Sequence, residues 1–349
     1  HETGYETVFV DVAMPVVTAL NERGAYPLRI VTDEGHETLT IDRVRAVDGR
    51  DVEAVARELA DARIVSTAVG VNVLPHIAPA LAKGIEARFT VSDSLQQLGH
   101  PDSGLLRTLR EVGMSPEEQE KYIRAAKAKA DAAKQADPLD IIVCENLLNA
   151  GPFLRGEVRK HLPEALHPVL ENRVGFVEAS IGRMVPVMTA EQHAEDPLLV
   201  CVEPYCELPV DALGFRGPIP EIAHLKPIPN FAAYVERKLF LHNMSHATCA
   251  YLGHLRGHAY IAEAIRDFFV RERVIKAMDE ALEGLARKHG LDRGPLQAHR
   301  DDLIHRYHNR ALGDQIPRVG RDPLRKLGPD DRLIGAATMC LQHDVSPRA

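Results

Sequence analysis

The chain has 349 residues, of which 45% are hydrophobic and 26% are charged, a composition typical of a soluble globular protein large enough for two packed domains. Its net charge is −8 and no long basic run is present, which argues against nucleic-acid binding and favours a small-molecule partner. No apolar run approaches the roughly 20 residues of a membrane-spanning helix, and five scattered cysteines without a CxxC pair or signal peptide predict reduced thiols in a cytoplasmic protein.

The first half of the chain alternates strand and helix signals. Strand-like runs occupy residues 5–12, 26–31, 38–47, 63–70, 139–146, 174–186 and 197–208. Helical patterns occupy residues 15–24, 51–62, 74–84 and 153–162. This alternation predicts an α/β domain with a parallel sheet covered by helices.

Two segments interrupt or end this pattern. A polar insertion at residues 88–137 contains a capping-box pair, Ser115 and Glu118, before an Ala/Lys-rich helix that we expect on the surface. A proline-rich stretch at residues 214–230 is predicted to be a loop, and from Phe231 onward the apolar residues recur at helical spacing. We therefore predict an α/β domain over residues 1–185 and a mainly α-helical domain over residues 186–349.

Polar residues follow several of the predicted strands. They are Asp11, the turn formed by Thr67, Ala68, Val69 and Gly70, and the sequence "CEN" at residues 144–146. In a doubly wound sheet the strand carboxyl ends meet at one crevice, where a dinucleotide binds. Asp11 would then accept hydrogen bonds from the adenosine ribose hydroxyls and repel a 2′-phosphate, which predicts NAD. Alternatively, Asp11 caps the helix that starts near Pro15.

The glycine-rich turn that precedes such an acidic residue is not present in these 349 residues. The chain begins at His1 and enters a strand almost at once. We therefore expect a first strand and its glycine-rich turn to lie upstream of residue 1.

The stretch "ERKLFLHNMSHATCAYLG" at residues 236–253 places polar side chains in an otherwise apolar helical pattern. At about 100° per residue, Lys238, Asn243 and His246 share one broad face. A buried lysine has a lowered pKa and can remove a hydroxyl proton, while the amide and the imidazole can hold substrate oxygens. Alternatively, Lys238 extends its charged end to solvent and the histidines are satisfied core residues.

Histidine pairs four residues apart also raise the possibility of a metal site. They are His242 with His246 and His254 with His258. The two pairs lie on different helix faces, since the pattern rotates by about 160° between them, and no HExxH glutamate is present. We predict no bound metal.

The chain resembles the polyol-specific long-chain dehydrogenase/reductase family, which is mannitol dehydrogenase-like. The resemblance is carried by "ERKLFLHNMSHATCAYLG", "IIVCEN", "STAVG" and "VGRDPLRKLGPDDRLIGAA" (residues 319–337), and it is densest in the helical half. It implies a Rossmann-like domain, a helical domain and a metal-independent enzyme that moves hydride between NAD and C5 of mannitol 1-phosphate to give fructose 6-phosphate. The family often has Asp-Arg where this chain has Gly182 and Arg183.

The same resemblance implies roles for individual residues. Lys238 matches the general base, Asn243 and Asn146 match the pair that polarises the substrate oxygen, and His246 matches the residue that positions the substrate. A phosphate-specific branch of the family is indicated by a cationic cluster in residues 318–326. The members of this cluster are Arg318, Arg321, Arg325 and Lys326.

The sequence leaves alternative interpretations of the cationic cluster and of the substrate open. The cationic cluster could instead form surface ion pairs with Asp322, Asp330 and Asp331. Within "NMSHAT", the Ser-His pair is shared with mannitol 2-dehydrogenases, so the protein could instead act on free polyols or sugar acids. A non-catalytic relative that binds a sugar phosphate would keep the same fold. We expect a monomer or a small homo-oligomer.

Overall fold

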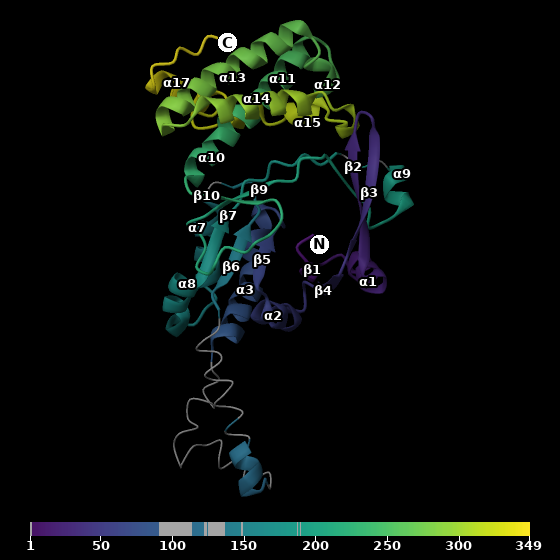
Figure 1. Ribbon diagram of the computed structural model, residues 1–349, viewed down its shortest axis with the longest axis vertical. Helices are drawn as coiled ribbons and strands as arrows, with labels where there is room; N and C mark the ends of the chain where they lie inside the picture. Colours follow the sequence, from purple (N-terminus) through teal and green to yellow (C-terminus); the bar gives the residue numbers. More distant parts are fainter. Residues whose placement is uncertain are drawn as a thin grey trace.

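The computed structural model describes residues 2–90, 114–121, 124, 137–147, 149–186, 188 and 190–349 (Figure 1). A strand-containing N-terminal half lies beneath a C-terminal half built of helices, with the chain end in the helical half. The predicted order of an α/β half followed by a helical half is confirmed.

The N-terminal half combines strands with helices. The strands are β1 (Thr7–Asp11), β2 (Ala25–Thr32), β3 (Gly35–Asp42), β4 (Val44–Asp48), β5 (Ile64–Thr67), β6 (Leu139–Val143), β7 (Val174–Glu178), β8 (Val200–Val202), β9 (Leu208–Asp211) and β10 (Leu225–Ile228). The helices are α1 (Met14–Arg23), α2 (Val52–Asp61), η1 (Val71–Val73), α3 (Leu74–Phe89), α7 (Ala150–Arg159), η3 (Glu164–Leu166), α8 (His167–Arg173) and α9 (Ala190–Glu195).

The helical domain comprises the elements from α10 onward. They are α10 (Phe231–Arg237), the π-helix η4 (Lys238–Asn243), α11 (Met244–Leu255), α12 (Ile261–Ala264), α13 (Phe268–His289), α14 (Arg293–Tyr307), η5 (Arg310–Leu312), α15 (Ile316–Gly320), α16 (Pro323–Lys326) and α17 (Ile334–Gln342).

Two parallel ladders form the predicted sheet. β1 pairs with β4, and β6 lies between β5 and β7. The second ladder is covered by α3 and α7, and its core includes Leu74, Ile141, Leu154 and Phe176. Among the described residues, β1 and β5 are not hydrogen-bonded to each other, so the sheet is in two parts.

The predicted strand at residues 38–47 is wrong as a single strand. Arg43 has φ of 54° and breaks it into β3 and β4. β3 turns back antiparallel along β2, which an all-parallel sheet does not allow, while β4 joins β1. The β2–β3 hairpin reaches the helical domain, where Asn309 Nδ2 donates to the carbonyl of Val31 at 3.2 Å (Figure 1).

The proline-rich stretch at residues 214–230 is also not entirely loop. Its last part forms β10, which runs parallel to β9 with Leu225 opposite Leu208. Pro227 lies within β10, which is tolerated because β10 is an edge strand. Proline content predicts a loop and hides a short edge strand of this kind.

The predicted capping box in the polar insertion is confirmed. The Ser115 backbone N–H donates to Glu118 Oε2 at 2.8 Å, and the Glu118 N–H donates to Ser115 Oγ at 3.3 Å. The Ala/Lys-rich segment that follows lies mostly outside the described residues.

The helical domain is organised around α13. Asp267 caps its first turn, and Gly290, with φ of 64°, ends it in the left-handed conformation that favours glycine. Val274, Met278 and Leu285 are buried at the centre of the domain core. In the part of the chain that the structure describes, no helix is both long and apolar enough to cross a bilayer.

Candidate active site between the two halves

The stretch that carries Lys238 is not a regular α-helix. Residues Lys238–Asn243 form a π-helix between α10 and α11, and the N–H of Met244 donates five residues back to the carbonyl of Leu239. π-helical turns are wider than α-helical turns and often occur at functional sites. The face predicted from α-helical spacing is therefore only approximate, and Lys238 and Asn243 stand at the two ends of one wide turn.

Lys238 joins the two halves of the molecule. Its Nζ donates to Oδ1 of Asn146 at 2.8 Å, and Asn146 follows β6 at the carboxyl end of the sheet. Burial of the amine, together with the positive charge of Arg332, lowers the pKa of Lys238 to about 8. A lysine with this pKa can release or accept a proton near neutral pH.

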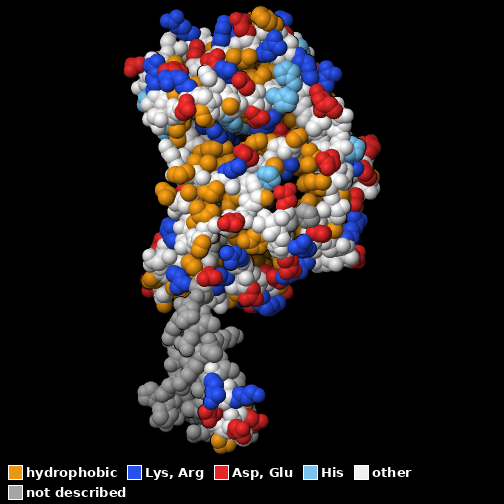
Figure 2. Space-filling model, in the orientation of Figure 1, with side chains coloured by type: hydrophobic (Ala, Val, Ile, Leu, Met, Phe, Trp, Pro, Cys, Tyr) orange, Lys and Arg blue, Asp and Glu red, His pale blue; other side chains and the backbone are white. Residues whose placement is uncertain are grey.

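A cavity of about 10 Å³ opens beside Lys238, which is the space of about one water. Its lining residues are Ser180, Gly182, Tyr205, Tyr234, Arg237, Lys238, His242, His299 and Arg306. Figure 2 shows Lys, Arg and His side chains along the furrow between the two halves. A ligand larger than a water molecule must therefore lie in the furrow or displace side chains from the cavity.

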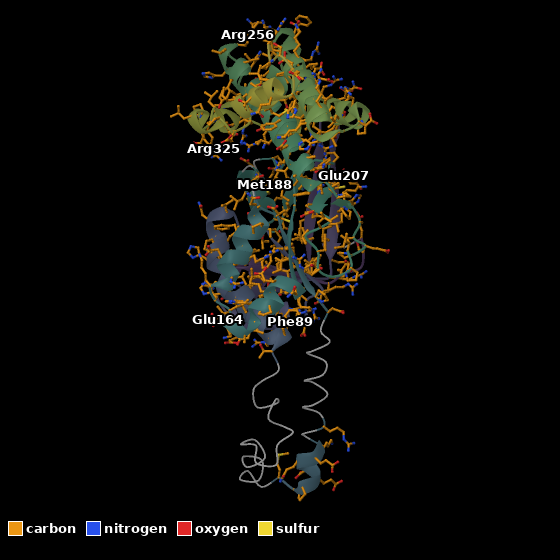
Figure 3. All side chains as sticks on the ribbon, turned by 90° about the vertical axis from the view of Figure 1, so that its left-hand side faces the viewer. Phe89, Glu164, Met188, Glu207, Arg256 and Arg325 are labelled. Carbon is orange, nitrogen blue, oxygen red and sulfur yellow. The ribbon has the colours of Figure 1, made fainter. Side chains whose placement is uncertain are left out.

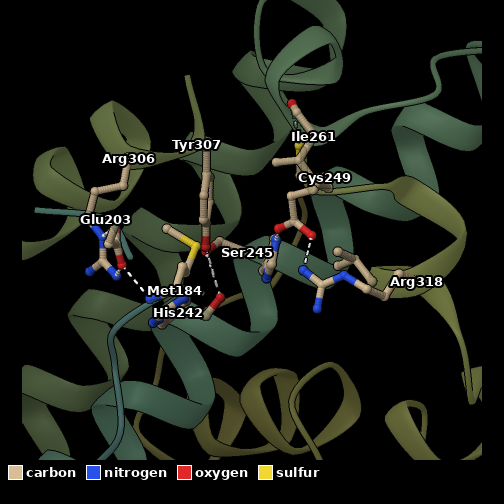
Figure 4. A network of polar contacts seen from close by, with 12 residues as sticks. Met184, Glu203, His242, Ser245, Cys249, Ile261, Arg306, Tyr307 and Arg318 are labelled. Carbon is tan, nitrogen blue, oxygen red and sulfur yellow. Dashed lines mark hydrogen bonds and ion pairs between the residues drawn. The ribbon is translucent and has the colours of Figure 1, made fainter. Parts of the chain in front are cut away.

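A buried ion pair closes one side of this cavity. Arg306 of α14 donates from Nε to Glu203 Oε2 at 2.9 Å and from Nη2 to Oε1 at 2.5 Å (Figure 4). Glu203 also accepts the backbone N–H of Met184 at 2.5 Å, and the guanidinium lies 4.4 Å from the ring centroid of Tyr205. The carboxylate is thus occupied by partners within the chain.

The positive charge beside Lys238 is not balanced by carboxylates in the lining. Arg306 and Glu203 neutralise each other, which leaves Arg237 and Lys238 as the lining cations without a carboxylate partner in the lining. The Nε of Arg237 is buried without a hydrogen-bond partner among the described residues. Burial, with the charges of Arg237 and Arg306, lowers the pKa of His299 to about 3. The surroundings favour an anionic ligand.

His246, on α11, contacts Asp314 and Tyr307. Its Nε2 lies 2.7 Å from Oδ2 of Asp314, and its ring stacks on Tyr307 with centroids 5.1 Å apart. The ring of His242, which lines the cavity, is 6.1 Å away. The side chain of Asn243 has no hydrogen bond to another described residue.

Of the three segments predicted to converge, the turn at residues 67–70 and the "CEN" segment at residues 144–146 are in contact. The carboxylate of Glu145 accepts the backbone N–H of Val69 at 2.8 Å and that of Gly70 at 3.0 Å. Gly70 has φ of 88°, which favours glycine. Oγ1 of Thr67 is buried at the end of β5 with no hydrogen-bond partner among the described residues.

Asp11 lies at the exposed end of β1. Its Oδ1 accepts the backbone N–H of Ala13 at 2.8 Å, so it stabilises the turn that leads into α1. The N-cap of α1 is Ala13 and not Asp11, so this contact is not the helix cap of the alternative interpretation. It leaves Oδ2 free of any hydrogen bond to the described residues.

Three of the four residues of the predicted phosphate cluster have partners within the chain. Arg318 pairs with Asp314, Lys326 donates to the carbonyl of Val319, and Arg325 lies 3.2 Å from Asp331. Figure 3 shows Arg325 on the side of the helical domain that faces the N-terminal half, with Arg256 at the far end. Arg325 has the ion pairs of the alternative interpretation, including Asp322 at 4.0 Å.

Arg321 differs from these three. Its side chain is exposed, and it forms no ion pair with a described residue. The phosphate-binding role of the cluster stays a prediction, and Arg321 is its one member with an uncommitted guanidinium among the described residues.

One histidine of each pair contacts a carboxylate of the chain. His258 lies 3.2 Å from Asp267, and His246 lies against Asp314. No group of three or more His, Cys, Asp or Glu side chains among the described residues is arranged to hold a metal ion.

Sequence reasoning missed several residues of this site. Glu145 lies in the quoted "CEN" motif and Glu203 directly follows a strand, so position alone could have indicated both. Arg306, Asp314 and Arg332 give no local signal, because their contacts join residues far apart in the chain.

Comparison with known proteins identifies two family models on this chain. The model described as mannitol dehydrogenase Rossmann domain matches residues 1–224, and the mannitol dehydrogenase C-terminal domain matches residues 230–349. Together they cover almost the whole chain.

Similar proteins and structures agree with these models. A mannitol-1-phosphate 5-dehydrogenase from Brevibacillus brevis is 36% identical over 345 residues, which are 99% of this chain and 77% of that protein. One from Aspergillus terreus is 35% identical over 98% of this chain and 76% of that protein. The fold is shared with Pseudomonas fluorescens mannitol 2-dehydrogenase in ternary complex with NAD and D-mannitol, at 19% identity and a TM-score of 0.61, covering 98% of this chain and 72% of that one.

Proposed function

The chain belongs to the mannitol dehydrogenase family, and on that premise we propose that it is an NAD-dependent oxidoreductase that interconverts mannitol 1-phosphate and fructose 6-phosphate. The observation that carries the proposal is the contact of Lys238 Nζ with Asn146 at 2.8 Å across the two halves, with the lysine pKa lowered to about 8. The five cysteines are free thiols, which supports a reducing, cytoplasmic setting.

The carboxyl ends of β1 and β5 fit a dinucleotide. Thr67 Oγ1 is a buried polar atom without a partner among the described residues, next to a turn whose N–H groups Glu145 fixes. We assign Thr67, Ala68, Val69 and Gly70 to contacts with the cofactor, and Asp11 to the ribose hydroxyls. When bound, NAD accepts the hydride in polyol oxidation, and NADH supplies it in ketose reduction.

The side chains of the chain itself handle the proton. We assign Lys238 as the base that takes the hydroxyl proton during oxidation and returns it during reduction. Because Asn146 accepts from Lys238 through Oδ1, its Nδ2 remains to donate to the substrate oxygen. Asn243 supplies a second amide donor, and His246 positions a neighbouring hydroxyl.

The charge around Lys238 supports a phosphorylated substrate. Arg237 and Lys238 line the cavity without a carboxylate partner in the lining, while Arg306 is neutralised by Glu203. A neutral polyol gains little from this field, whereas a phosphate dianion is attracted to it. We assign the phosphate to this cationic side of the furrow, with Arg321 as the uncommitted member of the cluster at residues 318–326.

The test is an assay of the full-length protein with fructose 6-phosphate and NADH. We expect NADH to be consumed and mannitol 1-phosphate to form in equal amounts, as followed by absorbance and by NMR of the product. Saturable binding of fructose 6-phosphate without turnover would contradict the proposal and identify a non-catalytic binding protein.

A further inference from the structure

The carboxylate of Asp314 contacts His246, and Arg318 contacts the same carboxylate. Asp314 precedes α15, and its Oδ2 lies 2.7 Å from Nε2 of His246, while its Oδ1 accepts from Arg318. Asp314 is 8% exposed, and its backbone carbonyl accepts the N–H of Ile261 at 2.9 Å, which fixes the loop. Both carboxylate oxygens are therefore engaged by named partners.

We propose that Asp314 is a positioning residue that fixes the orientation and tautomer of His246, and that Arg318 holds Asp314 in place rather than binding substrate phosphate. The inference rests on the proposed function, because it assigns the free nitrogen of His246 to a hydroxyl of the polyol.

The chemistry follows from the hydrogen-bonding capacity of each group. An ionised carboxylate only accepts, so Nε2 of a neutral His246 must carry the hydrogen. Nδ1 is then an acceptor and can receive the hydrogen of a substrate hydroxyl. Burial alone would raise the pKa of Asp314, but the hydrogen bond from His246 and the charge of Arg318 lower it below its usual value, which keeps the carboxylate ionised.

The imidazole ring of His246 is also packed against an aromatic ring on one face. Tyr307 stacks on His246 with an interplanar angle of 14°. The hydroxyl of Tyr307 is occupied by Ser245 Oγ at 2.9 Å and by the carbonyl of His242 at 3.0 Å (Figure 4). Tyr307 is therefore anchored independently, and His246 has little freedom to rotate away from the substrate.

The substitution Asp314→Asn tests the assignment. Arg318 can only donate, so it takes the oxygen of the introduced amide and turns the NH₂ group toward Nε2. The hydrogen of His246 must then move to Nδ1, which removes the acceptor meant for substrate. We expect kcat/KM for fructose 6-phosphate to fall about 10–100-fold, the range for partners that orient a functional histidine, with unchanged NADH affinity.

Two further variants separate positioning from folding. Adding Arg318→Met to Asp314→Asn frees the amide to rotate and present its oxygen, so part of the lost kcat/KM should return. Asp267→Asn is the matched control, because Asp267 makes the same kind of contacts with His258 at 3.2 Å and Arg256 at 3.1 Å away from Lys238. It should leave kcat/KM within about twofold of the unmutated protein.

The tautomer is measured directly by ¹⁵N NMR of histidine-labelled protein, with His246 assigned by comparison with His246→Gln. The expected result is hydrogen on Nε2 in the unmutated protein and on Nδ1 in Asp314→Asn. Hydrogen on Nδ1 in the unmutated protein, or a kcat/KM within threefold after Asp314→Asn, would overturn the inference. If the unmutated protein does not reduce fructose 6-phosphate, the proposed function fails, while the NMR result still decides the role of Asp314.

Discussion

Lys238 is the residue to which we assign the proton transfer. Its amine is partly buried, donates to Asn146 at 2.8 Å and has a pKa of about 8. Because a general base typically contributes 10²–10⁴-fold to rate, Lys238→Ala should lower kcat by roughly that factor. Steady-state kinetics measure the change in kcat, and a fluorescence titration measures the affinity for NADH separately. Lys276→Ala, which removes an exposed lysine paired with Glu272, is the control and should leave kcat unchanged. Near-normal turnover by Lys238→Ala would assign the base to another residue.

The pH dependence follows from the same amine. As the proposed base, Lys238 must be neutral for polyol oxidation, so kcat/KM for mannitol 1-phosphate should rise as pH increases through about 8. Ketose reduction needs the protonated form, so kcat/KM for fructose 6-phosphate should fall over the same interval. Rate profiles in both directions between about pH 6 and 10 check the sign. Profiles that move in the same direction would contradict a proton transfer by this group.

Arg321 and Arg325 should not behave alike. Arg325 is engaged by Asp331 at 3.2 Å, whereas Arg321 has no ion pair with a described residue. If Arg321 contacts phosphate, Arg321→Ala should raise KM for fructose 6-phosphate at least about tenfold, the worth of one charge-assisted hydrogen bond. Arg325→Ala should change KM less, and activity on free fructose should stay at its low baseline in both variants. Equal increases in KM for fructose 6-phosphate in the two variants would contradict the assignment of the phosphate contact to Arg321 rather than Arg325.

How far the sequence predicts the site depends on how local the contacts are. Lys238, Asn243 and His246 fall within nine residues, so spacing and resemblance single them out. Asp314 and Glu203 act on residues 68 and 103 positions away, and no local pattern records such pairings. For the phosphate cluster the sequence shows four cations close together but not their contacts: three of them have partners in the fold, and the phosphate-binding role stays a prediction.

At the scale of elements, the buried Arg306–Glu203 pair joins α14 to the segment that follows β8. The two side chains are 6% and 1% exposed, so removing one partner leaves a buried charge unpaired. Glu203→Ala should lower the free energy of unfolding by about 3–5 kcal/mol and visibly lower the thermal midpoint. Glu272→Ala, which breaks the exposed pair with Lys276, should leave the midpoint unchanged. Similar midpoints for the two variants in thermal scans would show that the buried pair is not a structural link.

Elements with strong periodicity and clear end signals were predictable. Pro15 and Gly24 delimit α1 as expected, with Gly24 at φ of 62°, and Asp51 caps α2. The break between β3 and β4 was missed because Arg43 is not a residue type that indicates a left-handed conformation. The π-helix could not be predicted, because its apolar and polar spacing is that of an α-helix and the wider turn is set by packing.

At the scale of the whole molecule, we assign the selection of NAD to Asp11 at the carboxyl end of β1. Asp11 would meet the 2′-phosphate of NADP with like charge, so NADH should bind at least about tenfold more tightly than NADPH, and Asp11→Asn should narrow the difference. Asp48→Asn is the control, because Asp48 lies opposite Asp11 on β4 and Arg50 already neutralises it. Equal or tighter binding of NADPH by the unmutated protein, measured by fluorescence titration, would remove the role given to Asp11.

The central claim is that a cationic furrow between the two halves selects a phosphorylated substrate for a lysine-dependent hydride transfer. The most direct test compares kcat/KM for fructose 6-phosphate and fructose with NADH on one preparation of the full-length protein. One phosphate contact of about 1.5–3 kcal/mol corresponds to a preference of roughly 10–100-fold or more for fructose 6-phosphate. Comparable efficiency on the two sugars would contradict the account and assign the protein to the enzymes that act on free polyols.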